Sequence, residues 1–308
     1  MTAFPGLEQP VLIDGGLATQ CEAMGHNIDG SLWSAKLLLE NPQAIVDAHR
    51  AFLEAGARII ATASYQASRH GLARVGLSSD EADEVLLESV RLAMRARDEF
   101  LAANPEPGYR PLVAASIGPW GAAQHDGSEY TGEYDVARSE LEAFHRQRLG
   151  VFERSESDLI ACETIPAIEE AQVLCDLLND VSKPAWVSFC CRDDAHISDG
   201  TDIEAAAELF RDHPRVFAVG ANCTAPEFIT PLVRRLTRVA PGKDIVVYPN
   251  SGETYCAEDN TWSGDDRRGS LDNLVAEWAE AGATLIGGCC RVGPEQIKAM
   301  AATGTFTS

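Results

Sequence analysis

The feature that most constrains the fold is a regular alternation between short apolar runs and longer amphipathic stretches. Eight runs rich in β-branched residues recur along the 308 residues, and each is followed by a stretch whose apolar residues return at helical spacing. Near-continuous apolar strands that alternate with helices are typical of a parallel sheet covered by helices. The runs that we expect to form strands are 11–16, 58–65, 112–119, 159–166, 185–191, 216–223, 244–250 and 284–290.

Eight strand–helix units in a chain of this length predict an α/β protein with a single closed (β/α)8 barrel, the TIM-barrel fold. A doubly wound open sheet is the alternative, because it has the same alternation. No linker and no low-complexity segment interrupts the pattern, so we expect one domain over residues 1–308. Helix starts are indicated by Asn41-Pro42, Pro226 and Pro294, and we expect Ser79-Asp80 and Ser270 to cap two further helices.

Charge and hydropathy argue against several classes of protein. The formal net charge is −22, from 47 acidic and 25 basic residues, so we expect neither a basic nucleic-acid-binding surface nor attraction to an anionic membrane. The sequence contains no apolar run long enough for a transmembrane helix and no signal-peptide pattern at its start. Nine cysteines, an odd number in a long chain, indicate reduced thiols rather than a disulfide scaffold. We therefore expect a cytoplasmic protein.

Polar and sulfur-containing side chains gather at the expected ends of the strands. In a barrel of this kind the active site is built from the carboxyl ends of the strands and the loops that follow them. A purely structural strand end would not need so many polar groups, so we expect a functional site at this mouth. The segments concerned are 14–16, 62–66, 116–120, 162–164, 190–191, 222–223, 248–250 and 289–290.

Three cysteines at two of these ends are candidates for a metal site. Cys289 and Cys290 are adjacent and follow Gly287-Gly288, whereas Cys223 ends another strand. Three thiolates leave one tetrahedral position open, which is typical of catalytic zinc, and sulfur ligands favour zinc over magnesium, calcium or manganese. The residues alone leave two other interpretations open. The cysteines could be small buried core residues, and Cys190-Cys191 could compete for the metal.

Seven longer motifs extend over essentially the whole chain, and they are IDGGLAT (13–19), ATASYQAS (61–68), SIGPWGAAQHDGSEYTG (116–132), ACETIP (161–166), VGANCTAP (219–226), VVYPNSGETY (246–255) and IGGCCRVGPEQI (286–297). Together they resemble the homocysteine S-methyltransferases, which are zinc-dependent thiol methyltransferase barrels. The resemblance implies that homocysteine is the methyl acceptor. It also implies that Cys223, Cys289 and Cys290 are the ligands of a Zn²⁺ ion.

The resemblance further implies a pocket for the amino-acid part of homocysteine. Glu163 would accept hydrogen bonds from the ammonium group, with Asp14 nearby, and backbone groups at Gly15 and around Thr62 would hold the carboxylate. An amino acid needs both a carboxylate and N–H donors in its pocket. From the residues alone, Glu163 could be an ordinary strand-end residue and Asp14 a turn residue before two glycines. Asn222 could line the mouth or brace its loops.

The reaction that the resemblance implies is the methylation of homocysteine to methionine, a step of methionine biosynthesis. The homocysteine thiol, acidified by zinc, loses its proton and takes a methyl group in line from a cationic donor. Gln66 and the loop 118–132 resemble members that use S-methylmethionine, with S-adenosylmethionine as a second candidate donor and betaine as the alternative. Trp33 and Trp120 are candidates for ring contacts with a sulfonium, or else ordinary packing residues.

The competing hypothesis from a different class is a non-enzymatic zinc or thiol redox protein. It would use the pairs Cys190-Cys191 and Cys289-Cys290 and would need exposed, low-pKa thiols without an amino-acid pocket. The expected convergence of Glu163 and Asp14 on one mouth argues against it. The seven histidines show no metal-type spacing such as HxxxH, and we expect most of them at the surface.

Overall fold

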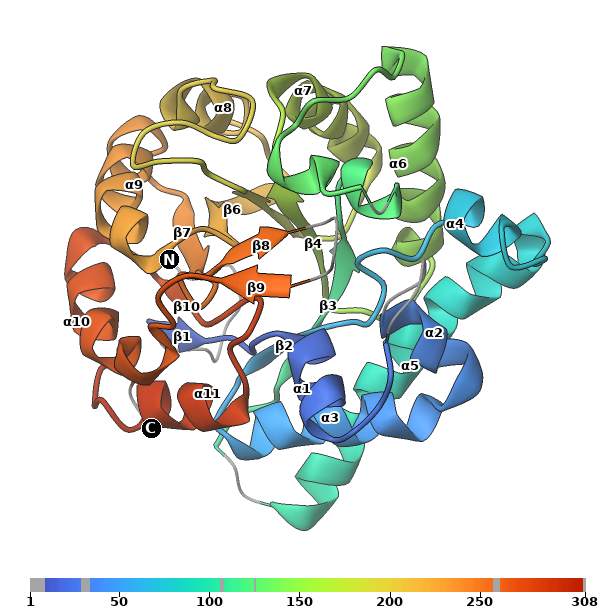
Figure 1. Ribbon diagram of the computed structural model, residues 1–308, viewed down its shortest axis with the longest axis horizontal. Helices are drawn as coiled ribbons and strands as arrows, with labels where there is room; N and C mark the ends of the chain where they lie inside the picture. Colours follow the sequence, from blue (N-terminus) through green and yellow to red (C-terminus); the bar gives the residue numbers. More distant parts are fainter. Residues whose placement is uncertain (1–8, 29–33, 106–107, 125, 257–260, 307–308) are drawn as a thin grey trace.

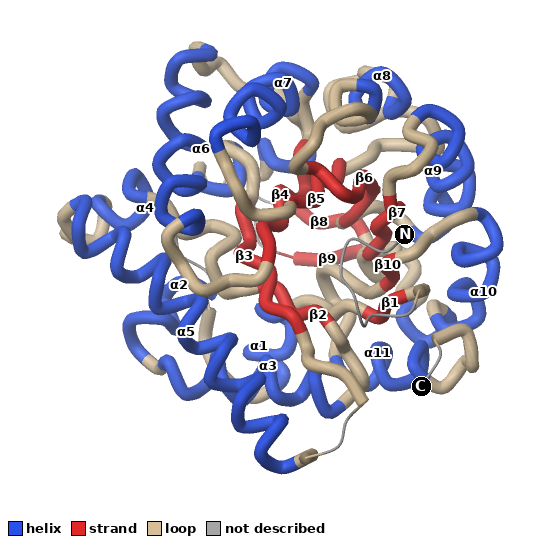
Figure 2. The backbone as a smooth tube through the Cα atoms, turned by 180° about the vertical axis from the view of Figure 1, so that it is seen from behind, coloured by secondary structure: helices blue, strands red, loops and turns tan. Residues whose placement is uncertain are grey.

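The computed structural model describes residues 9–28, 34–105, 108–124, 126–256 and 261–306. Within these ranges eight parallel strands form an inner sheet and helices form the outer layer, as Figures 1 and 2 show from opposite sides. The strands of this sheet are β1 (Val11–Leu12), β2 (Ile59–Ala61), β3 (Leu112–Ile117), β4 (Leu159–Ile165), β5 (Ala185–Phe189), β6 (Val216–Asn222), β7 (Asp244–Tyr248) and β10 (Leu285–Ile286).

The sheet closes into a barrel. Its strand order is β1-β10-β7-β6-β5-β4-β3-β2, and every neighbouring pair is parallel. A parallel bridge between Ile13 and Ile59 joins the two end strands, and the Arg58 amide donates to the Leu12 carbonyl at 2.8 Å. The predicted (β/α)8 barrel is therefore confirmed. The open sheet is wrong, because in an open sheet the two end strands would stay apart.

Helices follow the strands and surround the barrel (Figure 2). One helix packs outside after each strand, and the additional helices α1, α2 and α4 lie in the connections that follow β1 and β2. No helix within the described ranges is long and apolar enough to cross a membrane. The helices are α1 (Leu17–Ala23), α2 (Ser34–Glu40), α3 (Pro42–Glu54), α4 (Arg69–Ala73), α5 (Ser79–Ala103), α6 (Arg138–Glu153), α7 (Ile168–Leu177), α8 (Ile203–Glu208), α9 (Pro226–Val239), α10 (Asp272–Ala281) and α11 (Pro294–Ala301).

Two predicted helix caps are wrong, and local structure explains why. α5 is capped by Ser78 rather than Ser79, because the Ser78 hydroxyl accepts from the Glu81 amide while the Glu81 carboxylate accepts from the Ser78 amide. α10 begins at Asp272 after a short 3₁₀ turn that contains Ser270, so Ser270 is not its cap. At α5 two adjacent serines were available and only Ser78 completes the reciprocal bonds, whereas α10 continues from the 3₁₀ turn through Leu271 without a side-chain cap.

The predicted strands end too late at the mouth of the barrel. The run 58–65 pairs as a strand only over Ile59–Ala61, because residues 62–68 leave the sheet in turns. The sequence also gave no sign of an antiparallel hairpin formed by β8 (Thr254–Cys256) and β9 (Thr261–Ser263). Strands of three residues are too short to display an alternating pattern.

Alternation along the strands divides the barrel interior into two layers. Successive side chains of a strand point to opposite faces, so residues of one parity share the interior. The layer towards the amino ends of the strands is apolar, and Leu159 and Ala161 of β4 lie in it beside Trp186 of β5. The next inward positions, at the carboxyl ends of the strands, carry polar side chains instead. They are Ser116, Glu163, Ser188, Asn222 and Tyr248.

Candidate metal centre and substrate pocket

Three thiols meet at the carboxyl-terminal mouth of the barrel. Cys223 follows β6, and Cys289 and Cys290 follow β10. Their Sγ atoms all lie within 4.8 Å of one another, and the Sγ atoms of Cys223 and Cys290 are 3.3 Å apart. No other group of three metal-ligating side chains occurs in the described part of the chain. The Cys190-Cys191 pair lies outside this group, since the Cys190 and Cys191 thiols point to the backbone carbonyls of Cys223 and Phe189.

The backbone at both strand ends is shaped to bring these thiols together. Cys223 has a φ of +49° and Arg291, directly after Cys290, a φ of +69°, a left-handed conformation that non-glycine residues rarely adopt. Strain of this kind is concentrated at functional sites. Gly287 and Gly288 keep ordinary φ values, and glycine is needed there because neighbouring residues approach too closely to leave room for a Cβ atom. A Cβ at Gly288 would lie 2.1 Å from the Val292 side chain.

The cluster fits a tetrahedral metal ion with soft ligands. Two thiolates that bind one zinc ion at about 2.3 Å each lie about 3.8 Å apart, which agrees with the spacing of the three Sγ atoms. The thiols of Cys223 and Cys289 donate to Cys290 and hold its pKa well below its usual range. A thiolate therefore forms most readily at Cys290, and thiolates are the form in which cysteine binds metals. The site can hold a metal ion through three protein ligands.

Glu163 occupies the inward layer beside the thiols. It is 8% exposed, and its carboxylate accepts hydrogen bonds from the Ser116 hydroxyl and, at 2.9 Å, from the Tyr248 hydroxyl. Burial raises the pKa of Glu163, and these two hydrogen bonds oppose the increase. Each carboxylate oxygen has a second lone pair. Glu163 is therefore held rigidly and can still accept from a ligand.

Asp14 follows β1 and lies close enough to Glu163 for the charge of Glu163 to act on it. Its Oδ2 atom accepts from the Ala61 amide at 2.8 Å, and its side chain is 6% exposed. Burial raises the pKa of Asp14 well above its usual range, the Ala61 hydrogen bond opposes this, and the charge of Glu163 raises it further. Two buried carboxylates that repel each other form a site with a strong preference for a cation.

The backbone groups at Gly15 and Thr62 differ in availability. The Thr62 amide donates to the Ala114 carbonyl at 2.9 Å, and the Thr62 hydroxyl accepts from the Ser116 amide at 3.0 Å. Thr62 is therefore engaged in the barrel wall. The Gly15 amide, by contrast, donates to no atom of the described residues. Of the two, the N–H at Gly15 is the one available to a carboxylate.

Asn222 braces the mouth. Its Oδ1 atom accepts from the Thr164 amide at 2.7 Å and the Ser188 hydroxyl at 2.8 Å, while its Nδ2 atom donates to the Thr164 hydroxyl at 2.7 Å. Nδ2 also lies 3.8 Å from the Sγ atom of Cys289. The amide thus supports the left-handed Thr164, whose φ is +61°, and one thiol of the cluster. A direct contact between Asn222 and a substrate stays a prediction.

The loop between β3 and α6 lies over the thiols. The Tyr130 hydroxyl is 3.9 Å from the Sγ atom of Cys290. Gln66, on the neighbouring loop after β2, is 7% exposed, and its Oε1 atom has no hydrogen-bond partner in the described residues.

Trp120 packs against His70 and Phe144 with ring centroids 6.1 and 5.2 Å away, so its ring takes part in ordinary packing. Trp33 lies outside the described residues.

Sequence reasoning missed the buried group that anchors this loop. Glu170 of α7 is fully buried and accepts from the Trp120 amide at 2.6 Å and the Tyr134 hydroxyl at 3.1 Å, and it pairs with His145 at 2.7 Å. No motif pointed to it, because its partners come from separate parts of the chain.

The expectation that most histidines lie at the surface is also wrong for the described ones. Three of them, His49, His145 and His213, are buried.

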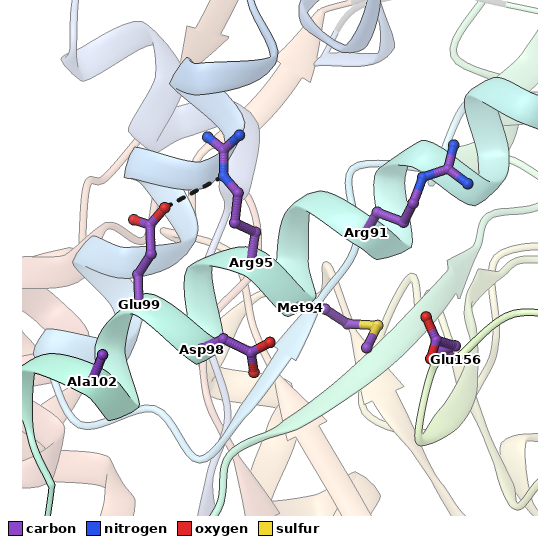
Figure 3. Close-up of a pocket in the computed structure, with 7 residues that line it drawn as sticks. All are labelled: Arg91, Met94, Arg95, Asp98, Glu99, Ala102 and Glu156. Atoms are coloured by element: carbon purple, nitrogen blue, oxygen red, sulfur yellow. Dashed lines mark ion pairs between the residues drawn. The ribbon is translucent and has the colours of Figure 1, made fainter.

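A separate groove of about 410 Å³ lies on the outer face of α5 (Figure 3). Arg95 pairs with Glu99 at 3.4 Å across it, whereas Arg91 and Asp98 pair with Glu84 and Arg97, which do not line the groove. Glu156, which also lines it, lies in the connection that leads into β4. The groove is therefore at the amino end of the strands, opposite the thiols, and is no part of the same site.

The family model described as homocysteine S-methyltransferase matches residues 11–303. The chain is 46% identical over 301 residues to homocysteine S-methyltransferase 4 of Zea mays, covering 94% of this chain and 88% of that one. It is 43% identical over 296 residues to the homocysteine S-methyltransferase of Escherichia coli, covering 95% and 94%. Its fold matches the crystal structure of the metallated homocysteine methyltransferase MmuM of Escherichia coli with a TM-score of 0.86, 41% identity and 96% of each chain covered.

Proposed function

The chain belongs to the homocysteine S-methyltransferase family and is a methyltransferase of that family, and from this premise we propose how the barrel mouth carries out the reaction. The observation that carries the proposal is the cluster of three thiols beside two buried carboxylates. The thiols suit a metal ion, and the carboxylates suit the ammonium group of an amino acid. Homocysteine has both a sulfur and an ammonium group to offer them.

We propose that the metal is zinc and that Cys223, Cys289 and Cys290 hold it. The spacing of the three Sγ atoms and the softness of thiolate ligands support zinc. A relative with 41% identity was crystallised in a form described as metallated, which is consistent with a metal at this place. When bound, zinc would supply a positive charge that lowers the pKa of the homocysteine thiol towards neutrality.

The protein residues around the thiols would orient homocysteine. Glu163, fixed by Ser116 and Tyr248, would accept from the homocysteine ammonium, with the charge of Asp14 close by. The Gly15 amide would donate to the substrate carboxylate, and Thr62 would shape the wall beside it. Groups that bind both ends of the amino-acid head direct the side-chain sulfur towards the cysteines. Position and electrostatics are the main contributions that the protein makes to such a displacement.

The chemical step is a methyl transfer between two sulfur atoms. The homocysteine thiol loses its proton to solvent, and a lone pair of its sulfur forms a bond to a methyl carbon of the donor. The bond between that carbon and the donor sulfur breaks, and its electron pair stays on the donor sulfur. With S-methylmethionine the products are two molecules of methionine and one proton. The reaction therefore needs no oxidant, reductant or further co-reactant.

We propose S-methylmethionine as the preferred donor, with S-adenosylmethionine as the second candidate and betaine as the alternative. The loop over the thiols is rich in polar groups, and Gln66 on the neighbouring loop has a buried acceptor atom without a partner. An amino-acid head on the donor needs several such partners, whereas betaine offers one carboxylate close to its nitrogen. This polar environment supports a donor with an amino-acid head.

The compartment and the extent of the domain belong to the same proposal. The eight cysteines whose side chains the structure describes have free thiols, and a three-thiol metal site persists best in a reducing compartment. We therefore propose that the enzyme works in the cytoplasm, where its product would enter methionine biosynthesis. We treat residues 1–308 as a single homocysteine-binding barrel domain.

The test is a methyl-transfer assay with saturating homocysteine and each donor at the same concentration. We expect methionine to form fastest with S-methylmethionine and not at all with betaine, measured as initial rates. Turnover with betaine equal to or above that with S-methylmethionine would overturn the donor assignment. A cobalt-substituted sample whose absorption spectrum does not respond to homocysteine, together with no turnover on any donor, would favour the non-enzymatic thiol protein.

A further inference from the structure

Glu129 is a buried acidic residue that the proposed homocysteine site does not use. It lies in a 3₁₀ turn, Ser128–Tyr130, of the loop between β3 and α6, and its side chain is 5% exposed. The turn is tightly packed, because a Cβ at Gly121 would lie 2.4 Å from the Glu129 amide nitrogen. The next residue, Tyr130, places its hydroxyl 3.9 Å from the Sγ atom of Cys290. Glu129 is thus held at the mouth of the barrel.

One oxygen of the Glu129 carboxylate lacks a hydrogen-bond partner. Its Oε2 atom is buried and accepts no hydrogen bond from the described residues, and no positively charged group is among those that mainly shift its pKa. Burial raises the pKa of Glu129 to about 7; a hydrogen bond from its own backbone amide opposes the increase, and the charges of Asp126 and Cys290 add to it. A buried acceptor without a donor destabilises the folded protein, because the acceptor has lost its hydrogen bonds to water and gained none in return. An unpaired buried acidic group of this kind indicates a cationic ligand.

Two further orphaned polar atoms lie on the same loop. The Nε2 atom of Gln124 and the hydroxyl of Ser128 are buried and have no hydrogen-bond partner in the described residues. The loop therefore carries one unused anionic acceptor and two unused donors. This combination matches the two ends of an α-amino acid, whose ammonium group donates and whose carboxylate accepts.

The position of Glu129 separates it from the homocysteine site. Glu163 and Asp14 influence each other, and Glu163 is fixed by Ser116 and Tyr248. Glu129 and Glu163 are both close enough to Cys290 for its charge to raise their pKa values, but neither is among the main groups that shift the pKa of the other. The thiol cluster thus has two acidic neighbours. When both substrates of a methyl transfer are amino acids, the enzyme has to hold two amino-acid heads at the same time.

We propose that Glu129 binds the α-ammonium group of the methyl donor and so selects sulfonium donors that carry an amino-acid head. This inference rests on the proposed function and adds the residue that recognises the second substrate. Gln124 and Ser128 supply donors for the carboxylate of the same head. The donor sulfonium is thereby brought to the thiol cluster from the side of the loop.

The experiment compares two donors that differ only in the amino group. They are S-methylmethionine and 4-(dimethylsulfonio)butanoate, which has the same sulfonium and carboxylate without the ammonium. The metal-loaded enzyme is assayed as wild type, as Glu129→Gln and as the control Glu133→Gln, which removes a charge from an exposed residue of the same loop. Metal content and homocysteine affinity are measured in each variant, together with S-methylmethionine binding by calorimetry.

Wild-type kcat/KM should be at least about thirtyfold higher with S-methylmethionine than with the analogue lacking the amino group, and Glu129→Gln should abolish most of that preference. The loss should appear mainly in KM and in the calorimetric affinity for S-methylmethionine, with metal content and homocysteine affinity unchanged. Glu133→Gln should behave as wild type.

Three results would overturn the inference. The first is equal kcat/KM for the two donors in the wild-type enzyme, a result that can be obtained without any variant. The second is an equal loss of kcat/KM with both donors in Glu129→Gln, which would make Glu129 a structural residue. The third is a loss of homocysteine affinity, which would assign Glu129 to the first substrate. A wild type that transfers a methyl group from no donor would instead contradict the proposed function.

Discussion

The two layers of the barrel interior are built by the same strands but hold opposite kinds of side chain. Leu159 in the lower layer and Glu163 in the upper layer both belong to β4 and both face inward. The lower layer is apolar and closely packed, whereas the upper layer is a polar network in which Tyr248 links Glu163 to Ser188. Stability and chemistry are therefore separated by four positions along one strand, as the barrel fold permits.

The hydrogen-bond network also explains why a polar layer can exist inside a barrel. A buried polar group is costly unless it is bonded, and Asn222, Ser188 and Tyr248 satisfy one another across three strands. At the mouth, the buried side-chain atoms that lack a partner in the described residues belong to the loops, at Gln66, Gln124, Ser128 and Glu129. The network gives rigidity to the ligand-facing groups, and the unsatisfied atoms mark where ligands are expected.

The largest effect should follow from removing one thiol from the upper layer. Cys290→Ala should lose most of its metal and reduce methyl transfer at least about a thousandfold, because a metal ion contributes several kcal/mol of charge stabilisation. Elemental analysis and initial rates measure the two losses. Cys190→Ala is the matched control, since Cys190 is a buried neighbouring thiol outside the cluster. Full metal content in Cys290→Ala, or its loss in Cys190→Ala, would contradict the ligand assignment.

The second effect concerns the lower layer alone. Leu159→Ala should reduce the free energy of unfolding by about 2–5 kcal/mol, because it leaves a cavity in a fully buried apolar cluster. Urea denaturation measures this change. Metal content and kcat/KM, determined under conditions where the variant is folded, should stay near the wild-type values. A variant that keeps its stability but loses metal would show that the two layers are coupled rather than separate.

The smallest of the three effects should be a selective loss of one ligand. Glu163→Ala should weaken homocysteine binding by about thirtyfold or more while the metal stays in place, because a buried charge-assisted hydrogen bond typically contributes roughly 2–5 kcal/mol. Titration of homocysteine into the cobalt-substituted protein measures the affinity. Glu133→Ala serves as the exposed control. Normal homocysteine binding in Glu163→Ala would mean that Glu163 is a structural strand-end residue.

Much of the fold could be predicted because it rests on local patterns. Each of the eight apolar runs contains one of the eight barrel strands, and the polar ends of those runs lie at one mouth. The three candidate ligands could be named for the same reason, since parallel strands of a barrel bring their carboxyl ends together. Loop structure could not be predicted in the same way. The hairpin formed by β8 and β9 and the 3₁₀ turn around Glu129 have no periodic signal.

The sequence by itself determined the class of fold, the mouth at which the chemistry is expected and the residue types available there. The spacing of apolar residues and the residue types at the strand ends are local properties, and a few neighbouring residues suffice to identify each. Only the tertiary structure decided which of those residues meet. It brought Cys223 within reach of Cys290, which is 67 positions away, used Asn222 as a brace and left the Oε2 atom of Glu129 without a partner in the described residues. These outcomes depend on strand register, on the left-handed turns at Cys223 and Arg291 and on competition among hydrogen-bond partners, all of which are set by contacts between distant parts of the chain.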